Sequence, residues 1–239
     1  MRIAAIGDVH FGTDSAGLLR PELLELAGRA DALLLAGDLT NHGTLDEARV
    51  VAAEFTDLGL PVVAVLGNHD YHSDAEGDIA AMLCDHGITV LEGTAVTFDI
   101  DGRTLGIAGT KGFGGGYEGK CAGIFGERLM REFAGHTADL AASLGSALAE
   151  LSTDVTLALT HYSPVTDTLV GEPPELYPFL GSYLLGKAID EFGADLALHG
   201  HAHAGSEHGK TPGGVPVRNV AQPVIHAACR VYELVPAAT

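Results

Sequence analysis

Apolar segments that resemble buried β-strands alternate along this chain with segments of helical character. Five of these segments end in a glycine or a polar residue, and they comprise residues 2–7, 32–37, 62–67, 155–160 and 194–200. Strands that alternate with helices are typical of a parallel sheet covered by helices, because a parallel connection needs a long crossover. The sequence therefore predicts an α/β fold. No linker or repeat divides the 239 residues, so we expect a single domain over residues 1–239.

Helices are expected between and after these strands. Thr44 and Glu47 form the pattern of a capping box, which satisfies the first free backbone N–H groups of a helix. Gly59 would stop that helix near Leu58, and Asp74 would cap the next one. The helices expected from apolar spacing and from such signals span residues 18–30, 45–58, 75–87, 127–151 and 182–192.

Other parts of the chain have a different pattern. Asp101-Gly102 lies between two apolar segments and predicts a tight β-hairpin over residues 95–109. The glycine-rich segment 111–126 and the proline-rich segment 171–178 are expected to be irregular. Two closing strands are expected within residues 214–221 and 229–235. About ten strands are too many for one open sheet, so we expect two packed sheets flanked by helices.

The composition limits the partners of the chain. Its formal net charge is −19, which disfavours nucleic acid and is also typical of adaptation to high salt. No apolar run approaches the ~18 residues of a membrane span, so no membrane partner is expected. The start of the chain carries no export-signal pattern. Cys84, Cys121 and Cys229 are widely spaced and odd in number, so we expect reduced thiols in a cytoplasmic protein.

Five polar motifs follow the apolar segments. The carboxyl ends of strands in an open α/β sheet can bring such side chains together at one edge. Residues two apart in an extended chain point to the same side, so Asp8 and His10 can bind one ion. The motifs, in chain order, are Asp8-Val9-His10, Gly37-Asp38, Gly67-Asn68-His69-Asp70, His161 and Gly200-His201-Ala202-His203.

Each motif taken alone also has an ordinary structural interpretation. Aspartates after strands are common in turns, paired histidines fit a solvated loop, and a single histidine fits the core or the surface. As an ordered set the motifs favour metal-assisted hydrolysis, because they supply carboxylate, amide and imidazole ligands at successive strand ends. In the third motif His69 is a titratable proton donor, and Asp70 could fix its tautomer.

The ordered set resembles the signature of the calcineurin-like metallophosphoesterase superfamily, which reads D-x-H, G-D, G-N-H-D/E, H and G-H-x-H. The resemblance extends from Asp8 to His203. It implies a four-layer α/β/β/α sandwich with two mixed β-sheets and a dinuclear metal centre. It also implies a catalytic role for His69, facing the leaving group, with Asp70 behind it. The implied ligands are Asp8, His10 and His203 for the first metal, Asn68, His161 and His201 for the second, and Asp38 as the bridge.

Departures from the family pattern limit which branch of the superfamily the chain resembles. The protein Ser/Thr phosphatase branch continues after Gly-Asp with Asp-Arg-Gly, whereas this chain continues with Leu39-Thr40-Asn41-His42. The tyrosine ligand of the purple acid phosphatases is also absent. The motifs resemble most the cyclic-nucleotide-phosphodiesterase-like branch. A histidine-rich ligand set suits Mn, Fe, Zn or Co, so we expect two divalent or mixed-valence transition-metal ions.

Three further residues are candidate substrate contacts. His42 and His72 lie beside ligand motifs, although a surface loop explains them as well. Lys111 begins a glycine run that could face a phosphate, but the run lacks the ending of a P-loop, and a flexible tether is an equal alternative. Segments 111–126 and 171–178 both follow strands and are expected to rim the metal site.

Three functions from different classes are compatible with these residues. The first is hydrolysis of a small phosphoester, a diester in preference to a monoester, by a metal-activated hydroxide. The second is a nuclease of the same superfamily, which would need a basic channel that the composition disfavours. The third is a non-catalytic scaffold, but such relatives typically lose ligand histidines, and every ligand position here is filled.

Overall fold

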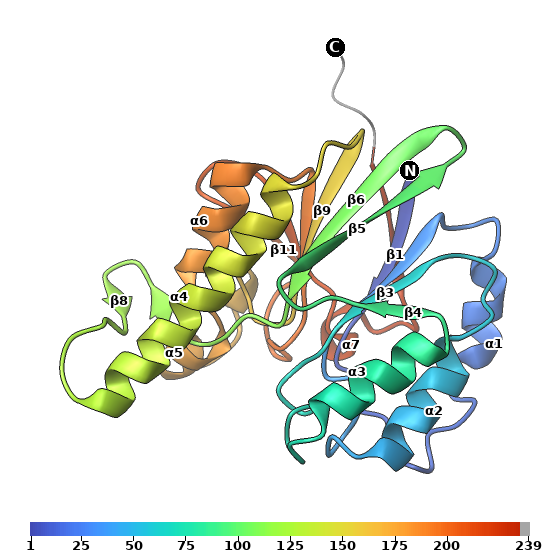
Figure 1. The fold of residues 1–239 in the computed structure, drawn as a ribbon, viewed down its shortest axis with the longest axis horizontal. Coiled ribbons are helices and arrows are strands. Elements are labelled where there is room, and N and C mark those ends of the chain that lie inside the picture. The colour runs from blue at the N-terminus through green and yellow to red at the C-terminus, as the bar shows by residue number, and fades with distance from the viewer. Residues whose placement is uncertain (235–239) are drawn as a thin grey trace.

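Two β-sheets pack face to face in the computed structural model, which describes residues 1–234, and helices cover both outer faces (Figure 1). In the first sheet β13 is antiparallel to β1, and the other pairs are parallel. The strands of this sheet, in spatial order, are β13 (Arg230–Glu233), β1 (Arg2–Ile6), β2 (Ala32–Ala36), β3 (Val62–Val65) and β4 (Ile88–Val90).

The second sheet is also mixed. Its four central strands are parallel, and an antiparallel strand lies at each edge. In spatial order they are β11 (His208–Lys210), β12 (Pro216–Asn219), β10 (Leu196–His199), β9 (Val155–Thr160), β6 (Arg103–Thr110) and β5 (Thr94–Ile100). A separate small ribbon pairs β7 (Gly116–Tyr117) with β8 (Lys120–Cys121).

Alternation along the strands produces the layers, because successive side chains point to opposite faces of a sheet. Leu34 faces the second sheet, where it packs in one buried cluster with Ile107 and Leu157. Its neighbours Leu33 and Leu35 belong to the cluster beneath the helices of the first sheet. These helices are α1 (Arg20–Leu23), α2 (Leu45–Phe55) and α3 (Glu76–Asp85).

The outer face of the second sheet is covered by α4 (Arg128–Ala149) and α6 (Tyr183–Phe192), whose apolar residues form a third buried cluster. The order of layers is therefore helix, sheet, sheet, helix. This confirms the predicted four-layer α/β/β/α sandwich with two mixed sheets. The remaining short helices are α5 (Tyr177–Leu180), α7 (Gln222–Ile225) and the 3-10 turns η1 (Leu24–Leu26), η2 (Asp167–Leu169) and η3 (Pro174–Leu176).

Local signals located several elements correctly. The capping box of Thr44 and Glu47 is formed in full at the start of α2. The expected hairpin is β5 and β6, with Asp101 and Gly102 both at positive φ in the turn. Of the two closing strands, β12 and β13 match the expectation, and Val235 lies outside the described residues.

Other local expectations are wrong. The helix expected over residues 18–30 is only α1 followed by η1, and Gly28 then turns the chain at φ +85°. The carboxylate of Glu54, far along the chain, accepts the backbone N–H groups at the start of α1. Asp74 does not cap α3, because the residue at the cap is Ala75 and no side chain bonds there. Segment 111–126 is not wholly irregular, since it contains β7 and β8.

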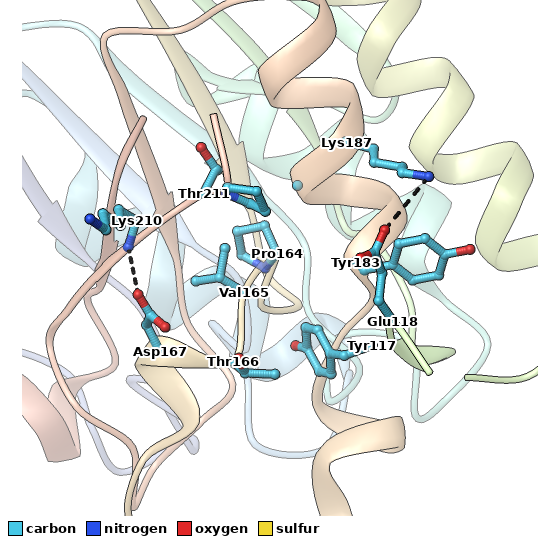
Figure 2. Close-up of a pocket in the computed structure, with 12 residues that line it drawn as sticks. Tyr117, Glu118, Pro164, Val165, Thr166, Asp167, Tyr183, Lys187, Lys210 and Thr211 are labelled. Atoms are coloured by element: carbon cyan, nitrogen blue, oxygen red, sulfur yellow. Dashed lines mark hydrogen bonds and ion pairs between the residues drawn. The ribbon is translucent and has the colours of Figure 1, made fainter. Parts of the chain in front are cut away.

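A cavity of about 410 Å³ lies between β7, the loop after β9, α6 and the end of β11 (Figure 2). Lys187 pairs with Glu118 at 3.8 Å on one side of it, and the backbone N–H of Lys210 donates to Asp167 on another. None of the residues that line it belongs to the five polar motifs. The helices within residues 1–234 are too short or too polar to cross a membrane.

Candidate metal centre

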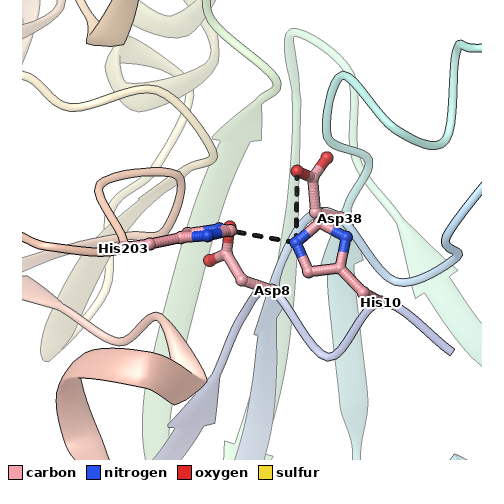
Figure 3. Close-up of side chains that lie close together, drawn as sticks. All are labelled: Asp8, His10, Asp38 and His203. Atoms are coloured by element: carbon pink, nitrogen blue, oxygen red, sulfur yellow. Dashed lines mark hydrogen bonds and ion pairs between the residues drawn. The ribbon is translucent and has the colours of Figure 1, made fainter.

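The five motifs lie just beyond the carboxyl ends of β1, β2, β3, β9 and β10. The first three of these strands are parallel neighbours in one sheet, and the last two are parallel neighbours in the other. Figure 3 shows Asp8 and His10 beyond the end of their strand, with His203 reaching them from a loop on the opposite side. Both sheets therefore contribute side chains to one place.

A first group of side chains contains Asp8, His10, Asp38 and His203, whose ligand atoms all lie within 4.8 Å of one another (Figure 3). Nε2 of His203 is 2.9 Å from Oδ1 of Asp8, and Nε2 of His10 is 3.8 Å from Oδ2 of Asp38. The two Nε2 atoms of His10 and His203 are 3.4 Å apart. A cation between these nitrogens would accept both lone pairs, whereas a hydrogen bond at that distance would be weak.

A second group contains Asp38, His161 and His201, again within 4.8 Å of one another. Nε2 of His161 is 2.9 Å from Oδ1 of Asn68 and 3.3 Å from Oδ1 of Asp38. The two carboxylate oxygens of Asp38 thus face different histidines, Oδ2 toward His10 and Oδ1 toward His161. A carboxylate placed in this way can bridge two ions.

Hydrogen bonds outside the two groups orient the rings. The Nδ1–H of His161 donates to the carbonyl of Ala36 at 2.8 Å, which leaves Nε2 facing Asn68 and Asp38. Nε2–H of His201 donates to the carbonyl of Phe179 at 3.3 Å, which leaves Nδ1 free. The backbone N–H of His201 also donates to both oxygens of Asp8. Rings fixed in this way present their lone pairs to a metal.

His161 and Asp38 shift each other's pKa strongly in the metal-free protein. Burial alone would lower the pKa of His161, but the adjacent Asp38 carboxylate outweighs it and raises the pKa to about 9. Burial opposes ionisation of Asp38 as well, yet His161 and the backbone N–H of His69 hold the pKa of Asp38 well below its usual range. Asp38 is therefore ionised in the metal-free protein, with the His161 proton as its counter-charge, and a bound metal ion would replace that proton.

The backbone of the motifs is shaped for this convergence. Asp8, His10, Asp38 and His201 all have left-handed φ angles, between +45° and +71°. Such angles cost non-glycine residues of order 1–3 kcal/mol, and they cluster at functional sites. At Gly67 a β-carbon would collide with Oδ1 of Asp38, and for that reason only glycine fits there. Together with the donor set, this geometry fits a centre for metal ions.

The third motif differs in part from expectation. The expected pairing of Asp70 with His69 is wrong. Asp70 is fully buried and accepts hydrogen bonds from the backbone N–H groups of Leu39, Thr40 and Gly67, as well as from the Thr40 hydroxyl. Its role is to hold the loop that follows β2 against the loop that follows β3. His69 is oriented instead by the carbonyl of Asn41, which accepts from its Nδ1–H at 2.8 Å.

The candidate substrate contacts have different surroundings. The ring of His42 is exposed and binds Glu47 at 2.9 Å, and the ring of His72 lies beside it with 6.3 Å between centroids. The surface-loop interpretation of these two histidines therefore stays open. Lys111 is buried, and its carbonyl accepts the backbone N–H groups of His161 and Tyr162 at 3.0 Å. This anchoring argues against a flexible tether at the start of the glycine run.

The two segments expected to rim the site lie against each other. The N–H of Gly115 donates to the carbonyl of Pro178 at 2.7 Å, and that of Gly116 donates to Gly181 at 2.9 Å. Segment 111–126 contacts His161, because the Lys111 carbonyl accepts the N–H of that residue. Phe179, which directly follows segment 171–178, accepts the Nε2–H of His201 through its carbonyl. The sequence carries no signal for these carbonyl contacts or for the Tyr162 ring, whose centroid is 4.3 Å from that of His201.

The fold and the convergent acids and imidazoles define a metal-dependent phosphoesterase. The profile of the calcineurin-like phosphoesterase family matches residues 1–205, and the chain belongs to this family. The family uses divalent metal ions and acts on small phosphoesters, which agrees with the two groups of side chains. No curated protein matches the chain in sequence.

Solved structures share the fold at low sequence identity. Phosphopantetheinyl hydrolase from Mycobacterium tuberculosis has a TM-score of 0.70 and 15% identity, over 96% of this chain and 95% of that one. GAP50 of Plasmodium, an anchor in the inner membrane complex, has a TM-score of 0.56 and 14% identity, over 93% and 72%. A putative 5′-nucleotidase from Staphylococcus aureus has a TM-score of 0.56 and 12% identity, over 91% and 48%. These likenesses support the fold alone.

Proposed function

We propose that this chain is a single-domain enzyme that hydrolyses a small phosphodiester with two transition-metal ions. The observation that carries the proposal is the position of Asp38, whose two oxygens face His10 in one group and His161 in the other. Asp8, His10 and His203 would hold the first ion, and Asn68, His161 and His201 the second. Mn, Fe, Zn or Co suits this histidine-rich set.

The bound ions would supply a hydroxide at neutral pH and offset charge on the phosphoryl group. His69 would supply a proton. Its Nδ1–H is engaged by the carbonyl of Asn41, so a protonated ring can donate only from Nε2. As the bond between phosphorus and the leaving oxygen breaks, this proton passes to that oxygen, and the product leaves as an alcohol. Asp70 is a positioning residue, because it binds the backbone of the two loops that carry Asp38 and Asn68.

Charge supports a small diester as the substrate. Two divalent ions, the Asp8 and Asp38 carboxylates and one hydroxide leave a local charge of about +1, which can hold a phosphate. The whole chain carries −19, which slows the approach of polyanions. A diester brings one negative charge and a monoester brings nearly two, so the diester meets less repulsion. Nucleic acid, a polyanion, meets the strongest repulsion.

The test is a substrate panel with added Mn²⁺ and metal analysis of the purified protein. We expect turnover of bis-p-nitrophenyl phosphate to exceed that of p-nitrophenyl phosphate, with no cleavage of single-stranded DNA. Preference for the monoester would overturn the diester assignment, and DNA cleavage would favour the nuclease. A phosphopantetheinyl ester belongs in the panel because of the structural likeness to a phosphopantetheinyl hydrolase. We further infer a cytoplasmic location from the three free cysteines, which cell fractionation would test.

A further inference from the structure

Lys111 follows β6 and is a buried cation, with only 6% of its surface exposed. Among residues 1–234 its ammonium has no carboxylate within ion-pair distance. The nearby Glu92 uses its two oxygens for the backbone N–H of Lys111 and for the Thr110 hydroxyl. A buried ammonium without a counter-ion is costly, and such groups are usually paired.

Three aromatic rings surround this ammonium. Nζ lies 4.4 Å from the ring centroid of Tyr71, 5.1 Å from that of Phe113 and 5.6 Å from that of Tyr162. Aromatic faces attract a cation, but they offset only part of the lost hydration. The rings therefore hold the ammonium in place and leave it able to bind an anion.

Lys111 is also fixed relative to the metal centre. Its carbonyl accepts the N–H of His161, a residue of the second ligand group, at 3.0 Å. The Tyr162 ring connects the ammonium to the same group, since its centroid is 4.3 Å from that of His201. An anion held by the metals at this end of the site would thus have a rigidly placed cation beside it.

We propose that Lys111 is a substrate-binding residue whose ammonium pairs with an anionic phosphoryl oxygen of the substrate, beside the ligand group of Asn68, His161 and His201. The inference rests on the proposed function, because it assumes that a phosphoester occupies the metal site. It adds a positive contact in a chain with four lysines and a net charge of −19. Since the contact is electrostatic, it acts mainly on the binding of phosphate and less on the chemical step.

The test measures binding of inorganic phosphate to the metal-loaded protein by calorimetry. We expect Lys111→Met, which keeps the length and the packing of the side chain, to weaken phosphate binding about tenfold or more. The same variant should raise the KM for bis-p-nitrophenyl phosphate more than it lowers kcat, with metal content unchanged. Lys111→Arg should retain most of the affinity. Lys120→Met is the matched control, since it removes the same charge from the exposed strand β8 and should bind phosphate as the wild type does.

Equal phosphate affinity in Lys111→Met and wild type would overturn the proposal. So would a loss confined to kcat. If Lys111→Met does not fold, the wild-type protein decides: saturating phosphate should slow chemical modification of Lys111 but not of Lys120, as read by peptide mass spectrometry, and equal rates would overturn the proposal. Phosphate binding through Lys111 without any ester hydrolysis would refute the proposed function alone. Ester hydrolysis without a role for Lys111 would refute this inference alone.

Discussion

Nδ1 of His69 lies 2.8 Å from the backbone carbonyl oxygen of Asn41 and donates its N–H to it. A carbonyl accepts a hydrogen bond and cannot donate one, so this contact fixes which nitrogen of His69 carries hydrogen in the neutral ring. The ring of His69 also lies edge-on to that of His10, with centroids 4.4 Å apart. His69 is therefore held beside the metal centre by the backbone and does not depend on a carboxylate partner.

We predict that His69→Ala retains the metals but loses roughly 10²–10⁴-fold in kcat on an alkyl phosphoester. The loss on a p-nitrophenyl ester should be clearly smaller, because that leaving group departs without a proton. Steady-state kinetics with both esters, and metal analysis of the variant, check this. Equal losses on the two esters would mean that His69 positions the phosphate and is not its proton donor.

Asp38→Asn should lower the occupancy of both metals together. One substitution removes the charge of an oxygen in each of the two groups, because Oδ1 faces His161 and Oδ2 faces His10. His203→Ala should mainly affect one ion, since His203 contacts the first group only. Metal content measured by mass spectrometry distinguishes the two variants. Two ions per chain in Asp38→Asn with normal turnover would refute the bridge.

Gly67→Ala should reduce metal content and activity without any change in ligand chemistry. The added β-carbon would collide with the Asp38 carboxylate and with its backbone nitrogen. Gly135→Ala in α4 is the control, because open space surrounds that position and alanine favours helix by about 0.5–1 kcal/mol. Metal analysis should show a loss of metal in Gly67→Ala. Thermal unfolding should show a small gain in stability in Gly135→Ala. Full metal content in Gly67→Ala would contradict the close packing.

Metal-free protein should lose stability as the pH rises. The folded-state pKa of His161 is raised to about 9 by Asp38, above its unfolded value of about 6.5. The stabilisation of the folded state by the His161–Asp38 pair is thus fully present below about pH 6.5 and is lost as the pH rises through about 9. Denaturant unfolding of the metal-free protein across this window should show the decline. His161→Gln should flatten it, while His208→Gln, an exposed control, should not. A decline of equal size in both variants would assign the effect to other groups.

Much of the fold and of the candidate site was predictable from local chemistry. The Thr44–Glu47 capping box and the Asp101-Gly102 turn act over a few residues, so the sequence alone locates α2 and the β5–β6 hairpin. The ordered motifs likewise indicated which side chains would converge, because each follows a strand and parallel strands end at a common edge.

What only the tertiary structure decided depends on partners distant in the chain. Glu54 accepts the backbone N–H groups of Leu19 and Arg20, over thirty positions earlier, and so sets where α1 begins. Asp70 accepts hydrogen bonds from the loop after β2, because the fold brings the free N–H groups of that loop, and not the His69 ring, to its carboxylate. Within residues 1–234 no carboxylate pairs with the Lys111 ammonium, and three rings from separate segments surround it. Periodicity and motifs are local properties of the chain, whereas hydrogen-bond partners and burial are set by which segments the fold brings into contact.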